Sequence, residues 1–196
     1  MAKKMLNNSI FEKFPILISL FALLISFLAL YRQRKQITVT FQPNIYPISK
    51  EDVSMTSLKR ESILDRDAYK TSVGIVNSSP LDIGFFDLRV FNPETNVNYY
   101  LATKKSLAEI GNNDLYLHYS DGVTKLEIPD KNHGVLKANS YTTLDIIIVT
   151  NGKDSNKIGL AFKIPKSVFF GRDFFSVTNR KKFKAFGIIY DLSKTI

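Results

Sequence analysis

The residues with the most obvious capacity for chemistry are two histidines, and neither falls in a recognisable catalytic or metal-binding motif. His118 and His133 have no second histidine at metal-ligand spacing, and the chain contains no cysteine. The P-loop, the nucleophile elbow and the dinucleotide-binding glycine pattern are all absent from the sequence. We therefore expect no catalytic residue, no metal and no cofactor.

Two groups of acidic residues have the type of spacing seen in glycosidases and calcium sites. Asp65 and Asp67 flank Arg66, and Asp82 and Asp87 flank a predicted β-bulge. Acids in such positions are more often solvated loop residues, so we interpret them as surface groups. A hydrolase is the least favoured of the functions considered.

The segment VFFGRDFF, which begins at Val168, contains two phenylalanine pairs on either side of Gly-Arg-Asp. If they were exposed, these pairs would form an aromatic contact patch for a partner protein. The alternative, which we favour, is that both pairs pack on one end of a β domain and that Gly-Arg-Asp forms a turn.

Positive charge is concentrated at the two ends of the chain. The formal net charge is +9, of which residues 1–35 contribute +5 and residues 180–196 contribute +4, whereas residues 36–179 are neutral. A nucleic-acid-binding domain usually carries its basic residues on one face of the fold. The distribution therefore argues against a nucleic-acid partner.

An uncharged run from Phe14 to Tyr31 predicts a transmembrane helix. Its length of about 27 Å is close to the thickness of the hydrocarbon core of a bilayer. A cleaved signal peptide would require small residues before the cut, and the residues around Ala29 do not provide them. A buried helix is the remaining alternative. We expect a retained single span, with residues 1–13 as a basic tail and residues 32–35 as a basic juxtamembrane segment.

The side of the membrane is not fixed by charge. Three basic residues precede the run and three follow it closely, so the positive-inside rule favours neither orientation. We expect a cell-membrane location and slightly favour an extracytoplasmic domain, because the pattern of the following residues is typical of extracytoplasmic β modules.

After Lys35 the apolar residues recur with a period of two, which is typical of half-buried strands. About eight such segments are separated by turn residues, and they predict that residues 36–196 form an all-β, antiparallel immunoglobulin-like β-sandwich. Residues 44–67 are expected to form a long loop. Ile146 and Ile148 are predicted core residues. The pattern slips beside Gly84, which predicts a β-bulge there.

Two sets of residues are predicted to act at the membrane. Small residues at spacings of three and four form a seam for helix packing, and they are Ser19, Ala22, Ser26 and Ala29. If the first and last strands pair in parallel, the basic residues at both ends form one collar at the lipid headgroups. The collar residues are Arg32, Arg34, Lys35, Arg180, Lys181, Lys182 and Lys184.

The run from Phe14 to Lys35 and the segment VGIVNSSPLDIGFFDLRVF from Val73 together resemble a loose group of small bacterial membrane-anchored proteins. The resemblance implies one span followed by an immunoglobulin-like domain of unassigned function. The abundance of Lys, Asn and Ile is similar to that of Firmicute proteins. No catalytic residue is implied by this resemblance.

Taken together, these features predict a non-catalytic, membrane-anchored accessory protein whose partners are the lipid bilayer and another protein. The alternative is a cell-envelope module that binds glycan or lipid. Such a module would need a concave aromatic site, for which Tyr99, Tyr100 and Tyr116 are the candidates.

Overall fold

Antiparallel β-strands make up most of the described chain after residue 36. The structure, a computed structural model, describes residues 2–32, 36–55, 68–108, 114–150, 156–165 and 183–194, and within these it leaves out the side chains of residues 2–13, 30, 32 and 194. All strand pairings within these residues are antiparallel. The prediction of an all-β, antiparallel domain is therefore confirmed.

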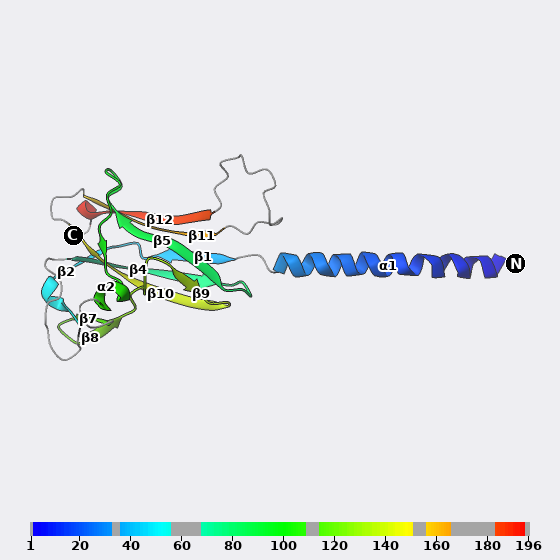
Figure 1. Cartoon of the computed structure of the whole chain (residues 1–196), viewed down its shortest axis with the longest axis horizontal. Helices are drawn as coiled ribbons and strands as arrows, with labels where there is room; N and C mark the ends of the chain where they lie inside the picture. Colours follow the sequence, from blue (N-terminus) through cyan, green and yellow to red (C-terminus); the bar gives the residue numbers. More distant parts are fainter. Residues whose placement is uncertain are drawn as a thin grey trace.

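Two larger sheets pack face to face (Figure 1). The first sheet has the order β1-β4-β10-β6, and β2 also pairs with β4. Its strands are β1 (Ile37–Phe41), β2 (Tyr46–Ile48), β4 (Ala68–Asn77), β6 (Tyr100–Leu101) and β10 (Ser140–Val149). The second sheet has the order β12-β11-β5-β9. Its strands are β5 (Ile83–Phe91), β9 (Gly134–Leu136), β11 (Lys157–Pro165) and β12 (Phe183–Asp191), and η2 (Leu192–Lys194) follows β12.

The main core lies between these two sheets because alternate residues of each strand point inward. Ile146 and Ile148 of β10 are both 0% exposed, which confirms their prediction as core residues. Phe162 of β11 stacks on Phe186 with 5.4 Å between ring centroids, and it also contacts Phe41 of β1. These rings link both sheets. Aromatic pairs of this kind stabilise a fold by more than the burial of their apolar area alone.

A third, smaller sheet covers part of the outer face of the first sheet, and it was not predicted. Its order is β3-β7-β8. Its strands are β3 (Val53–Ser54), β7 (Leu115–His118) and β8 (Val123–Leu126), and the helices η1 (Lys50–Asp52) and α2 (Lys104–Ala108) lie in the adjoining segments. A second apolar cluster fills this layer, and it includes Leu115 from β7 and Ile147 from β10. Part of the segment predicted as a long loop thus contains β2, η1 and β3.

The predicted β-bulge occurs in β5, but its position is Asp87 and not Gly84. Ala161 of β11 pairs with Arg89, whereas Lys163 pairs with Phe86, so β5 carries one extra residue between them. Asp87 has a φ of 54°, a left-handed conformation that Asp tolerates better than most residues. The carboxylate of Asp87 forms an ion pair with Lys163.

The chain before the sheets forms one helix, α1 (Ala2–Arg32), which includes the predicted tail as well as the predicted span. Figure 1 shows α1 extending away from the sheets. Its large apolar side chains from Phe14 to Leu28 are between 51% and 69% exposed. Over the residues that were described, no helix has the length and hydropathy needed to cross a membrane.

Candidate functional site at the helix-proximal end of the domain

The strand registers bring one end of both larger sheets to the point where the chain arrives from α1. β1 begins at Ile37, which lies opposite Asn77 at the end of β4. The chain turns there and enters β5 at Ile83, and β11 runs antiparallel to β5 and ends at Pro165, opposite Phe183. β12 therefore begins at the same end as β1 (Figure 1). We call this end of the domain the helix-proximal end.

The parallel pairing of the first and last strands, which was the condition for the predicted collar, does not occur between β1 and β12. β1 pairs with β4 and β12 pairs with β11, and both pairings are antiparallel. The two strands belong to different sheets, although they start at the same end of the domain. The placement of the start of β12 near the start of β1 therefore holds, but it follows from the sheet order and not from direct pairing.

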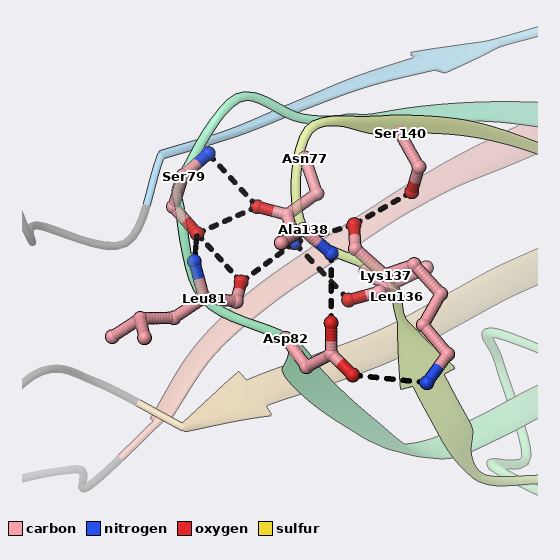
Figure 2. Close-up of polar contacts among 8 residues, drawn as sticks. All are labelled: Asn77, Ser79, Leu81, Asp82, Leu136, Lys137, Ala138 and Ser140. Carbon is pink, nitrogen blue, oxygen red and sulfur yellow. Dashed lines mark hydrogen bonds and ion pairs between the residues drawn. The ribbon is translucent and has the colours of Figure 1, made fainter.

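A buried asparagine organises the turn between β4 and β5 (Figure 2). The Nδ2 group of Asn77, which is 1% exposed, donates to the carbonyls of Leu81 at 3.0 Å, Leu136 at 3.1 Å and Lys137 at 2.9 Å. Its Oδ1 accepts hydrogen bonds from the backbone N–H and the hydroxyl of Ser79, at 3.1 and 2.8 Å. One side chain thus joins the turn after β4 to the segment between β9 and β10, which crosses from the second sheet to the first.

Asp82 fixes the same two segments from the surface (Figure 2). Its carboxylate accepts hydrogen bonds from the backbone N–H of Ala138 at 2.8 Å and from Lys137 Nζ at 3.0 Å. The Ala138 N–H, followed by the Lys137 ammonium, holds the pKa of Asp82 below its ordinary value, because both favour the charged carboxylate. Asp82 therefore has a structural role at the surface, because its carboxylate is occupied by these two hydrogen bonds.

Exposed apolar residues surround this turn. Leu81 is 48% exposed, and its side chain points away from the polar network in Figure 2. Val135 of β9 is 58% exposed and lies opposite Gly84. Phe86 is 37% exposed and contacts the ring of Phe183 edge-on, with 6.2 Å between centroids.

The predicted basic collar falls largely outside the described residues. Arg34, Lys35, Arg180, Lys181 and Lys182 lie outside them, and the side chain of Arg32, the last residue of α1, is not described either. Lys184 is the second residue of β12 and is exposed at the helix-proximal end, with Nζ 4.7 Å from the centroid of the Phe186 ring. The collar therefore remains a prediction. The strand order places one of its residues, Lys184, at the helix-proximal end.

The predicted packing seam lies on the exposed surface of α1. The hydroxyl of Ser19 donates to the carbonyl of Pro15 at 2.9 Å, and that of Ser26 donates to the carbonyl of Ala22 at 2.8 Å. Both hydroxyls are thus satisfied within their own helix, which lowers the cost of placing them in an apolar environment. Ala29 is exposed as well. Helix association through these four residues remains a prediction.

A second surface feature lies on the outer face of the second sheet. Phe91 and Ile189 are the partners of Gly159 on either side, and a Cβ at Gly159 would lie 2.7 Å from the Phe91 ring. The glycine therefore lets the ring lie against the sheet. The guanidinium of Arg89 sits 4.5 Å from the centroid of the same ring, and Ile189 is 60% exposed. We call these four residues the outer-face stack.

The structure also pairs a serine with a histidine that are 64 residues apart in the sequence. Ser54 Oγ lies 2.6 Å from His118 Nε2. Such a pair can form part of a nucleophilic centre, but Ser54 is 0% exposed and His118 is 7% exposed, so a substrate cannot reach the hydroxyl in this conformation. The contact joins β3 to β7. His133 is exposed beside Asn132, and no cluster of three or more potential metal ligands occurs among the described residues.

The tyrosines proposed for a glycan or lipid site do not share an open surface. Tyr99 is 7% exposed and belongs to the main core, whereas Tyr100 of β6 is 47% exposed. Tyr116 lies in β7 of the small sheet and is half-buried. A concave site built on all three rings is therefore excluded in this conformation.

Comparisons with known proteins give little further information. No family model matches the chain, and no curated protein matches it either. The yjhA protein of Bacillus subtilis has a similar solved structure, with 10% identity, a TM-score of 0.39, and coverage of 66% of this chain and 75% of that one. The ycdA protein of Bacillus subtilis is similar at 8% identity and a TM-score of 0.35, over 82% of this chain and 39% of that one. Both likenesses are too weak to support an argument.

Proposed function

We propose that this protein is a non-catalytic accessory protein, anchored in the cell membrane by residues 14–31, that presents its β-domain to a protein partner. In this proposal the two facing antiparallel sheets form an immunoglobulin-like sandwich. The extracytoplasmic side is favoured for the domain. The buried Ser54 and the committed contacts of Asp82 support a role without catalysis.

The observation that carries the proposal is the apolar surface of α1. Consecutive positions such as Ile16, Leu17 and Ile18 are each more than half exposed, so the apolar side chains cover all sides of the helix. Among the residues whose side chains the structure describes, neither apolar core of the β-domain includes one from α1. A helix that is apolar all round is normally buried in a protein or a membrane, and the uncharged run from Phe14 to Tyr31 in the sequence has the length of a span.

The anchor is tested by washing membranes that contain the full chain with alkaline carbonate. We expect the chain to stay in the membrane pellet at its full length. Release into the supernatant, or recovery of an N-terminally shortened chain, would contradict the anchor. A protease-accessibility assay on a C-terminal tag in intact cells then determines the side on which the domain lies.

The outer-face stack is our candidate for the protein contact. Arginine and aromatic residues are enriched among the residues that dominate binding energy in protein interfaces, and Arg89 and Phe91 are already stacked. Ile189 extends the same face. The stack lies away from α1, toward the opposite end of the domain, where a partner can reach it.

The contact is tested by crosslinking the full chain in cells and comparing its captured partners with those of two variants. Ile189→Asp should reduce the crosslinked partner strongly, because it places a charge in the proposed interface. Val123→Asp is the control, since Val123 is 43% exposed and lies in β8 of the small sheet, which covers the first sheet and not the second. Equal capture by wild type and Ile189→Asp would refute the assignment of this face.

A further inference from the structure

We infer that the helix-proximal end of the β-domain rests on the membrane surface through exposed apolar side chains. This inference depends on the membrane anchor proposed above. The residues that carry it are Leu81, Val135 and Phe86, and we call them the proximal apolar patch. Their partner is the interfacial region of the bilayer.

The first argument is the short connection between the anchor and the domain. Five peptide steps separate Arg32 from Ile37, so these residues lie at most about 18 Å apart whatever path the chain takes. The polar region of a bilayer adds only about 5–8 Å outside each edge of the hydrocarbon core. An anchored α1 therefore holds the start of β1, and the whole helix-proximal end with it, close to the headgroups.

The second argument is the position of the patch at the end of the domain nearest to α1. The polar groups of the turn are satisfied internally by Asn77 and Asp82, so Leu81 can meet the interface without exposing unpaired groups (Figure 2). Val135 and Phe86 lie one to three residues from the start of β5 in the register, which places them within roughly 10 Å of this end. Aliphatic and aromatic side chains at this depth are stabilised by burial between headgroups.

The third argument is the charge of the same surface. Among the described residues of the helix-proximal end, Lys137 and Lys163 are paired with Asp82 and Asp87, and Lys184 adds a cation at the start of β12. The surface thus carries no net negative charge that an anionic bilayer would repel. Lys184 can extend toward lipid phosphates while the patch contacts the apolar part of the interface.

The chain has no cysteine, so the inference can be tested with single-cysteine variants of the full protein in vesicles. Leu81→Cys and Val135→Cys carry a fluorophore, and the vesicles contain phosphatidylcholine, phosphatidylglycerol and a headgroup nitroxide quencher. Val123→Cys and Val97→Cys are controls of comparable exposure at the opposite end. We expect quenching at positions 81 and 135 and none at positions 97 and 123.

A second variant tests whether the apolar contact causes the quenching. Leu81→Asp, combined with the label at position 135, should lose most of the quenching, while the exposed position of Leu81 keeps the fold intact. Equal, weak quenching at all four positions would overturn the inference if the chain remains in carbonate-washed vesicles. Release of the chain by carbonate would instead overturn the anchor, and the inference with it.

Discussion

Replacing Asn77 with aspartate should destabilise the β-domain, and the loss should grow as the pH rises. The substitution keeps the shape of the side chain but replaces a group that donates to three carbonyl oxygens with one that only accepts when charged. A charged carboxylate facing these oxygens with 1% exposure is strongly disfavoured. The pKa of the new carboxyl in the folded state should therefore be raised.

The magnitude follows from the hydrogen bonds and from the cost of protonation. A protonated aspartate can donate one of the original bonds, and the loss of the others costs about 1–3 kcal/mol. Keeping the group protonated costs up to about 1.4 kcal/mol for each pH unit above its ordinary pKa of about 3.9. The pKa of the new carboxyl is raised in the folded state. The variant is therefore least affected at a pH near the ordinary pKa of about 3.9, and it loses stability as the pH rises from there toward the raised pKa of the folded state. Between about pH 4.5 and pH 7 the additional loss should reach about 3 kcal/mol.

The assay is urea unfolding of the full chain in detergent micelles, followed by the near-ultraviolet circular dichroism of its tyrosines. Asn77→Ala should cost about 2–4 kcal/mol at both pH values, because it removes the bonds without adding a titrating group. Asn98→Asp is the exposed control and should stay within about 0.5 kcal/mol of wild type. If Asn77→Asp showed the same loss at both pH values, the proposed role of the three carbonyls would be wrong.

Three further changes test other parts of the fold. Ile148→Asp should lower the free energy of unfolding by several kcal/mol, measured by urea titration, because it places an unpaired charge in the main core. Tyr190→Phe should cost about 1–2 kcal/mol in the same assay, since the Tyr190 hydroxyl lies 2.9 Å from the Thr71 hydroxyl and donates to a backbone carbonyl. Asp82 has a lowered pKa in the folded state, so its contribution is present above its ordinary pKa and is lost as the pH falls through the folded value. Asp82→Asn should therefore be less stable than wild type near neutral pH, with the difference shrinking in acid.

The all-β class and part of the core could be predicted because alternation of apolar residues directly reflects the pleat of a strand. Ile146 and Ile148 follow that pattern and lie in the core. The Tyr119 N–H is bonded to the Gly122 carbonyl in the turn that joins β7 to β8, and Ser, Asp and Gly are residue types that favour turns. Local patterns were reliable where one face of a strand is buried and the other is solvated.

The third layer could not be predicted, because β10 is buried on both faces at its end. Ile147 and Val149 point away from the main core, yet they are covered by the small sheet. An apolar run such as IIIV does not reveal which other strands cover its second face.

The candidate site could be predicted only in part, because it depends on strand order. The basic residues near both chain ends were visible in the sequence, but which end of the domain each group lies at depends on how β4, β5, β11 and β12 succeed one another. Leu81 and Val135 gave no separate signal, because a single exposed apolar residue in a loop or short strand is ordinary. The pairing of Ser54 with His118 could not be predicted either, because 64 residues separate the two partners and only the folded chain brings them together.

The position of β1 also determines how the domain would respond to mechanical load. β1 continues from α1 and is an edge strand paired with β4 through five residue pairs, from Ile37 opposite Asn77 to Phe41 opposite Val73. A pull on α1 directed away from the domain acts along β1, whereas antiparallel ladder bonds lie perpendicular to the strand. The pull would shear all the rungs together and would not open them one after another, and the inward-facing side chains of Val39 and Phe41 would have to slide at the same time. The chain thus enters the domain in a shear geometry, in which tension from the proposed anchor would be shared by all five residue pairs of β1 and β4.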